Sequence, residues 1–191
     1  MGNFKSIANM MNYLSIDCEI RSKPPSASEI THLIIPGVGS FDSGMQLIEQ
    51  SGWMETIKSL PKNVNLLGIC LGMHLLTKGS EEGKLPGIGL IDGFCRKFDS
   101  KTSKVPHVGW NTVANVKKDL LLKEASNLKF YFSHSYYVEV NDKNLVSSDT
   151  YYGINFASSI NRENLFGLQF HPEKSHKFGM DVLSNFANLS C

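Results

Sequence analysis

The stretch Val64-Asn65-Leu66-Leu67-Gly68-Ile69-Cys70-Leu71-Gly72 decides the fold. The run Val64–Ile69 is mostly apolar, which indicates a buried strand, and Leu71–Lys78 has the apolar content of a helix. Between them lies a G-x-nucleophile-x-G turn, the pattern that joins a strand to a helix and exposes a nucleophile at the end of the strand. A strand, a tight turn and a helix in this order predict a parallel sheet of the α/β class.

Helix and strand patterns alternate on both sides of this stretch. Apolar residues recur at helical spacing over residues 4–14, and further helices are expected around residues 43–50, 54–60 and 178–189. The apolar run His32–Ile35 ends at Pro36-Gly37 and predicts another buried strand. Shorter strand-like runs are expected to pair antiparallel in the second half, at residues 129–133, 136–140, 144–148 and 165–170.

We therefore expect one domain over residues 1–191. It is a three-layer α/β sandwich, flavodoxin-like, with a mostly parallel central sheet and an antiparallel extension.

Composition excludes several classes of protein. The 191 residues carry 19 basic and 18 acidic side chains, so there is no basic excess for binding nucleic acid. No run of about 18 apolar residues predicts a membrane span. Four cysteines (Cys18, Cys70, Cys95 and Cys191) lie far apart without a CxxC pair, which favours a reducing cytoplasm over disulfides. The six histidines lack a ligand spacing, so we expect neither a metal nor a cofactor.

Cys70 is the candidate nucleophile. The flanking glycines give the turn the space that a strained backbone needs, and the following helix begins at the sulfur, where its dipole favours a thiolate. The amide N–H of Leu71 would then point at the oxyanion of a tetrahedral intermediate. The alternative is a buried, inert cysteine between two packing glycines.

His171 is the candidate base, because it follows the strand-like run at 165–170 and catalytic groups gather at the carboxyl ends of strands. Glu173 stands two residues further on and can hold the imidazole in one tautomer. The alternative is a surface pair without a catalytic role. The loop Pro36-Gly37-Val38-Gly39 also follows a strand, and its glycines allow a close approach to substrate, although alone it is an ordinary glycine turn.

Together and in this order, these three elements resemble the class I (triad) glutamine amidotransferases, and most closely the glutaminase subunit of imidazole glycerol phosphate synthase. The narrower resemblance rests on stretches spread over nearly the whole chain: Met1–Ser6, Ser80–Glu82, Pro106–Asn111, Tyr131–Tyr136 and Phe170–Ser175. It implies that Cys70 attacks the side-chain amide of L-glutamine, that His171 transfers protons, and that Glu173 orients His171. Glutamate and ammonia are the implied products.

The resemblance also implies roles for residues around the triad. It implies that the oxyanion hole and the glutamine site are formed by Leu71, Gly37, Val38, Gly39, His74, His134, Ser135 and Tyr136. The implied partner is a (β/α)₈-barrel cyclase that receives ammonia within a heterodimer and makes imidazole glycerol phosphate and an aminoimidazole carboxamide ribotide. The implied interface contains Pro106, His107, Trp110, Asn111 and Lys174. Composition alone would place Trp110 in the core.

Two features depart from the family pattern. His74 stands where the family usually has a glutamine that holds substrate; it can make fewer amide-like hydrogen bonds and, if protonated, would favour a Cys70 thiolate. The chain also opens on Met1-Gly2-Asn3, inside the turn that follows the family's first strand. We therefore expect that the first central strand is missing and that a longer form is the competent one.

Other readings remain open at this point. A paralogous amidotransferase subunit would supply ammonia for the amidation of surface-polysaccharide sugars. A cysteine hydrolase such as a γ-glutamyl peptidase would act without a partner. A non-catalytic subunit would only support a barrel.

Overall fold

The computed structural model describes residues 4–26, 29–117, 119–122 and 127–190. Its helices are α1 (Phe4–Tyr13), α2 (Phe41–Gln50), α3 (Trp53–Lys58), α4 (Leu71–Leu75) and α5 (His176–Ala187), and 3-10 turns lie at η2 (Lys143–Leu145) and η3 (Pro172–Lys174). Its strands are β1 (His32–Ile35), β2 (Asn65–Ile69), β3 (Gly93–Lys97), β4 (His107–Thr112), β5 (Lys129–His134), β6 (Tyr136–Val140), β7 (Val146–Tyr152), β8 (Ile154–Arg162) and β9 (Leu165–Leu168).

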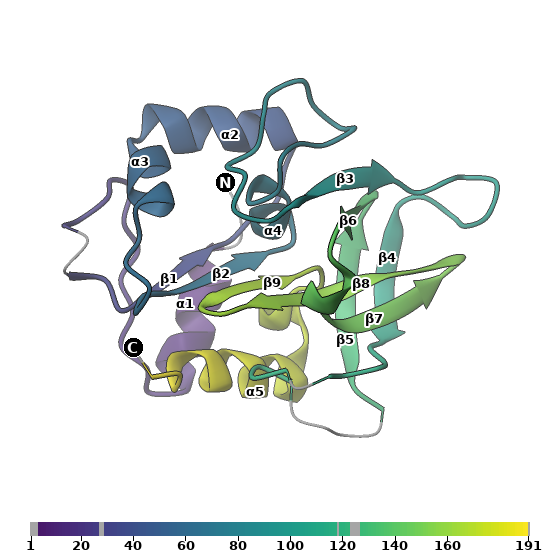
Figure 1. The fold of residues 1–191 in the computed structure, drawn as a ribbon. Coiled ribbons are helices and arrows are strands. Elements are labelled where there is room, and N and C mark those ends of the chain that lie inside the picture. Colours follow the sequence, from purple (N-terminus) through teal and green to yellow (C-terminus); the bar gives the residue numbers. More distant parts are fainter. Residues whose placement is uncertain (1–3, 27–28, 118, 123–126, 191) are drawn as a thin grey trace.

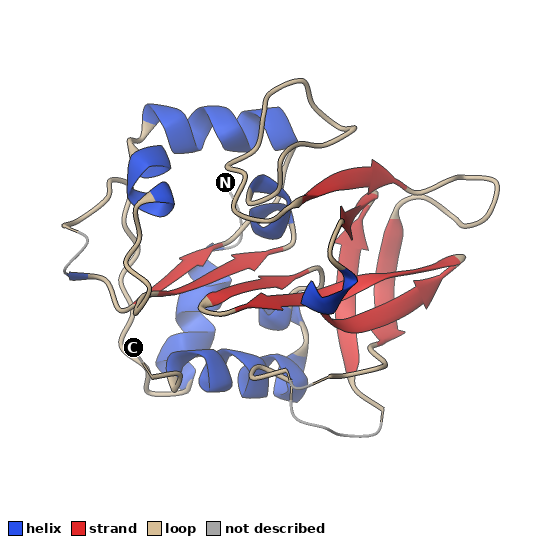
Figure 2. Ribbon diagram, in the orientation of Figure 1, coloured by secondary structure: helices blue, strands red, loops and turns tan. Residues whose placement is uncertain are grey.

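The central sheet has the order β1-β2-β9-β8-β7, with the strands labelled in Figure 1 and drawn in red in Figure 2. Its first three strands are parallel, and Gly68 of β2 lies opposite both Ile35 of β1 and Gly167 of β9. β8 runs antiparallel to β9, and β7 runs antiparallel to β8. The predicted parallel sheet with an antiparallel extension is therefore confirmed.

Helices cover both faces of this sheet, α1 and α5 on one face and α2, α3 and α4 on the other (Figure 1). The alternation of side chains along β2 produces the two cores. Leu67 and Ile69 belong to the core that contains Ile7 of α1 and Phe186 of α5. Leu66 belongs to the other core, with residues of α2 and α3. The expected three-layer sandwich is confirmed.

The second half of the chain pairs differently from the sequence expectation. β5 and β6 are separated only by Ser135, yet β5 pairs with β4 and β6 pairs with β3. The run that begins at Leu165 forms β9, which pairs antiparallel with β8 on one side and parallel with β2 on the other. All four residues of β9 are buried, as is usual for a central strand.

Strand β8 was missed because serines interrupt its apolar pattern. Ser158 and Ser159 are almost fully buried. Their hydroxyls bond to hydroxyls of β7: Ser158 to Thr150 at 2.9 Å, and Ser159 to Ser148 at 2.7 Å. Buried hydroxyls that satisfy one another in this way replace the apolar contacts that a sequence pattern detects.

The described residues begin with α1, and β1 lies at one edge of the central sheet. Met1, Gly2 and Asn3 lie outside the described residues, as does Cys191, so the expectation of a missing first strand stays a prediction. Within the described ranges, no helix has the length and apolar character needed to cross a membrane.

Candidate active site

Cys70 stands between the end of β2 and the start of α4, in the predicted elbow. Its φ and ψ are 51° and −110°, a conformation that a side chain makes costly and that is typical of a strained functional residue. Its N–H donates to the carbonyl of Leu168 at 2.6 Å, which ties the elbow to β9. Its thiol points to the carbonyl of Ser133 at 3.9 Å, so the sulfur lies beside β5.

Close packing explains the glycines of this turn. A Cβ on Gly68 would lie 2.7 Å from the backbone nitrogen of Met73, and a Cβ on Gly72 would overlap the carbonyl oxygen of Ile35. Gly37 packs against the elbow from the neighbouring loop, because its Cβ would lie 2.5 Å from the nitrogen of Gly72. The absence of three side chains therefore lets β1, its loop and α4 meet at Cys70.

His171 is held against β5 by its own backbone. Its N–H donates to the carbonyl of Tyr131 at 2.8 Å. The hydroxyl of Ser175 donates to the carbonyl of His171 at 2.6 Å and accepts the N–H of Tyr131 at 3.0 Å. These bonds fix the turn η3 beside the strand whose Ser133 carbonyl contacts the Cys70 thiol.

The imidazole of His171 forms an ion pair with Glu173, with 2.9 Å between Nδ1 and Oε1. The two side chains are only 1% and 2% exposed. Burial lowers the pKa of His171, but the interactions with Cys70 and Glu173 outweigh burial and raise this pKa to about 9. Within the described part of the chain, no residue competes with Cys70 for Nε2 of His171. Cys70 raises the pKa of His171 through hydrogen bonding and, to a smaller extent, through its charge, so Nε2 is placed for proton transfer with the sulfur.

The loop Pro36–Gly39 lies beside this centre through the contact of Gly37 with Leu71 and Gly72. Gly39 has a φ of 120°, which side chains rarely adopt. Val38 is 42% exposed at the tip of the loop. The structure thus brings the loop to the elbow, while its role as an oxyanion donor stays a prediction.

His74 is only 4% exposed and faces Gln169, with 2.9 Å between Nε2 and Oε1. Burial lowers the pKa of His74 to about 4, so the imidazole is neutral at pH 7. His74 was expected to favour the Cys70 thiolate only if it is protonated, and burial means that this condition is not met at pH 7.

Gln169 is the residue that the sequence reasoning missed. It is fully buried, and its Nε2 lies 3.8 Å from the Cys70 sulfur. A signal was present: Gln169 stands two residues before His171, and alternation in an extended segment turns both side chains to the same side.

His134 and His107 form a buried chain of hydrogen bonds. Nδ1 of His134 donates to the carbonyl of Tyr136 at 2.7 Å. Burial holds the pKa of His134 well below its ordinary value, so the ring is neutral and its Nε2 accepts from Nδ1 of His107 at 3.0 Å. Nε2 of His107 then accepts from the side-chain amide of Asn111 at 3.2 Å. The chain connects β4 with the segment after Ser135.

The predicted interface residues divide by exposure. His107 is 4% exposed and faces inward, so it supports β4 from inside. Pro106 is exposed, and Trp110 is 47% exposed, so the expectation from composition that Trp110 is a core residue is wrong. The ring of Trp110 stacks on His176 at 5.5 Å, and the ammonium of Lys174 lies 5.6 Å from the ring of Tyr131.

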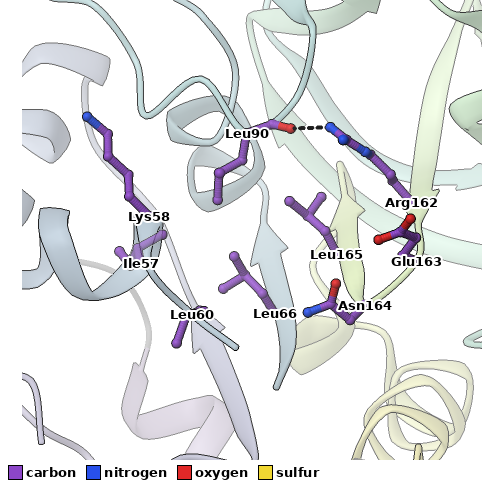
Figure 3. A pocket seen from close by; sticks show the side chains of 9 residues that line it. All are labelled: Ile57, Lys58, Leu60, Leu66, Leu90, Arg162, Glu163, Asn164 and Leu165. Carbon is purple, nitrogen blue, oxygen red and sulfur yellow. Dashed lines mark hydrogen bonds between the residues drawn. The ribbon is translucent and has the colours of Figure 1, made fainter. Parts of the chain in front are cut away.

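A pocket of about 160 Å³ lies elsewhere, at the starts of β2 and β9 (Figure 3). Leu66, Leu165 and Leu90 line it, and Arg162 donates to the carbonyl of Leu90 at its rim. Cys70 follows the opposite end of β2, so this pocket is separate from the triad. Within the part of the chain that is described, no group of three or more His, Cys, Asp or Glu residues has the arrangement of a metal site.

Comparison with solved structures supports the fold. Two solved structures share the fold: a glutamine amidotransferase with a TM-score of 0.71 at 15% identity, covering 98% of this chain and 95% of that chain, and a glutamine amidotransferase from Thermotoga maritima with a TM-score of 0.57 at 17% identity, covering 97% and 76%.

Relatives in sequence are more informative. Imidazole glycerol phosphate synthase subunit HisH 2 of Methanococcus maripaludis is 47% identical over 190 residues, covering 97% of this chain and 94% of that protein. Subunit HisH of Leptospira interrogans is 42% identical over 196 residues, covering 99% and 96%. Residues 1–189 match the family model described as glutamine amidotransferase class-I. The chain therefore belongs to the class-I glutamine amidotransferases and, within them, to the HisH subunits of imidazole glycerol phosphate synthase.

Proposed function

We propose that this chain hydrolyses L-glutamine to glutamate and ammonia with Cys70, His171 and Glu173, as the glutaminase subunit of an imidazole glycerol phosphate synthase in histidine biosynthesis. One observation carries the proposal. The strained Cys70 lies in the same buried centre as an imidazole whose pKa is raised to about 9 by Cys70 and Glu173. An inert buried cysteine would need neither the strain nor a charged neighbour.

The reaction proceeds in two halves. The Cys70 sulfur attacks the side-chain amide carbon of glutamine, and the protonated His171 gives its Nε2 proton to the departing nitrogen, which leaves as ammonia. Neutral His171 then takes a proton from water, whose oxygen attacks the glutamyl thioester and releases glutamate and the thiolate. Glu173 holds Nδ1–H throughout, which fixes the tautomer and stabilises the charged ring.

The oxyanion of each tetrahedral intermediate needs donors. Leu71 is the first residue of α4, so its N–H belongs to the unpaired donors of a helix start. The loop around Val38 is the second source, because Gly37 packs directly on the elbow. Loss of one such donor costs about 10²–10³ in rate, so the position of this loop can control the reaction.

The partner is a (β/α)₈-barrel cyclase, which receives ammonia before water can protonate it. Its docking surface on this chain lies on β4 and η3. Val108 and Trp110 are 55% and 47% exposed on β4, and the ammonium of Lys174 lies over the ring of Tyr131, which pairs with Trp110 across β4 and β5. Neighbouring exposed apolar side chains with a charge close by suit a protein partner. The names of the relatives, which describe subunits of a synthase, support an assembly of this kind.

The experiment compares two nitrogen sources in the complex of this chain with the barrel. In Cys70→Ala, we expect synthase turnover with glutamine to disappear and turnover with ammonium salts to remain, because only the nucleophile is lost. Cys95→Ala is the matched control. Burial raises the pKa of the Cys95 thiol to about 12, so this cysteine is inert and both activities are expected to persist. Glutamine-dependent turnover that survives Cys70→Ala would refute the proposal.

A further inference from the structure

The fully buried side chain of Gln169 connects the Cys70 sulfur with His74. Its amide nitrogen lies 3.8 Å from Sγ of Cys70, and its amide oxygen lies 2.9 Å from Nε2 of His74. His74 itself is 4% exposed. Cys70 at the start of α4, Gln169 just after β9 and His74 within α4 thus form a buried line of polar contacts.

The donor and the acceptor in each of these two hydrogen bonds follow from the chemistry of the groups. A thiolate only accepts, so the amide of Gln169 stabilises it only when its nitrogen faces the sulfur. The two ends of a carboxamide have nearly the same shape, so packing alone does not select this orientation. A donor at the oxygen end selects it, and neutral His74 has one N–H to offer there.

We propose that His74 is a positioning residue that acts through Gln169: its Nε2–H holds the amide oxygen and thereby keeps the amide N–H on the Cys70 sulfur. Gln169 is the group that touches the nucleophile. The proposal rests on Cys70 being the nucleophile of the proposed function. It gives His74 a role other than a direct contact with glutamine.

Burial keeps His74 neutral, which is consistent with its role as a hydrogen-bond donor to Gln169. The pKa of His74 is lowered to about 4, so at neutral pH the ring does not place a positive charge near the protonated His171. His74 therefore affects the thiolate only through the hydrogen bond that it donates. A glutamine at position 74 also carries an N–H donor and would serve the same purpose.

The test is a double-mutant cycle on the alkylation of Cys70 by iodoacetamide, which requires no glutamine turnover and is followed below the midpoint of the wild-type pH profile of alkylation. At such a pH, loss of a hydrogen bond to a charged group lowers the thiolate population about tenfold, partly offset by greater intrinsic reactivity, so we expect alkylation about threefold slower in Gln169→Leu and in His74→Leu. His74→Gln is expected to restore most of the rate lost in His74→Leu. In the Gln169→Leu background, His74→Leu is expected to change nothing further.

Met73→Leu is the matched control, because it alters a fully buried side chain of α4 without changing a polar group. Additive effects in the double variant, or His74→Gln as slow as His74→Leu, would overturn the proposal. A raised KM for glutamine with unchanged alkylation would instead make His74 a substrate ligand. If His74→Leu does not fold, Gln169→Leu and His74→Gln still decide, because the first must slow alkylation and the second must not. Failure of the proposed function would be separate: glutaminase activity would survive Cys70→Ala.

Discussion

Acid should destabilise this protein through His74, and His74→Gln should remove that sensitivity. In the folded chain the pKa of His74 is about 4, against 6.5 for an ordinary histidine. Below pH 6.5 the imidazole of His74 is therefore mostly protonated in the unfolded chain, whereas in the folded chain it stays mostly neutral down to about pH 4. The stabilising contribution is complete above pH 6.5 and is lost as the pH falls from 6.5 to 4. The loss is about 2 kcal/mol at pH 5 and about 3 kcal/mol at pH 4.

Urea unfolding at pH 7 and pH 5 measures this loss. With a slope of about 2 kcal/mol per M, the wild-type midpoint should fall about 1 M further than that of His74→Gln. The buried His107 contributes equally in both proteins and cancels in the comparison. His134 cancels only in part, because His74 contributes to the lowered pKa of His134, so His74→Gln also reduces the acid sensitivity that His134 adds. His176→Gln, which removes an exposed imidazole, should behave as the wild type. An equal fall in the wild type and His74→Gln would refute the argument that the buried, neutral ring governs this sensitivity.

Three further predictions concern the elbow, the triad and the surface. Gly72→Ala places a methyl group on the carbonyl oxygen of Ile35, so calorimetry should show a loss of at least about 1–3 kcal/mol; an unchanged Tm would contradict the packing argument. Glutaminase kcat/KM should fall as the pH rises through about 9, where His171 loses its proton. Glu173→Gln should move this fall to lower pH, because it removes the charge that stabilises the protonated ring. A fall at the same pH in the variant would exclude the ion pair as its cause. Trp110→Ala should weaken barrel binding at least about tenfold in a titration while changing the free energy of unfolding by less than about 1 kcal/mol; unaltered affinity would remove Trp110 from the interface.

The elbow was predictable because its chemistry is local. The glycines around Cys70 and the strand before it specify a strained turn within a few residues, and the structure has a φ of 51° there. The pairing of His171 with Glu173 was equally local, since the two residues are two positions apart, although a 3-10 turn and not the expected extended segment brings their side chains together. The parallel sheet followed from the buried runs at β1 and β2 for the same reason.

Contacts between distant parts of the chain were not predictable from one sequence. The bond between His74 and Gln169 joins residues 95 positions apart. The burial that keeps the imidazole neutral is likewise a property of the folded chain and not of the local sequence. β5 pairs with β4, and β6 pairs with β3, although β5 and β6 are neighbours in the sequence. These pairings depend on the positions of β3 and β4 in the folded chain. Trp110 looked like a core residue by composition, and only the three-dimensional position of β4 shows that its ring is half exposed.

The central claim is that Cys70 is the nucleophile that attacks the glutamine side chain. A glutamine analogue with a diazoketone in place of the amide alkylates such a nucleophile, and peptide mass spectrometry locates the adduct. The account predicts an adduct on Cys70 and none on Cys18 or Cys95, protection by glutamine, and loss of glutaminase activity in proportion to labelling. Labelling of another residue, or full activity after Cys70 is labelled, would contradict it.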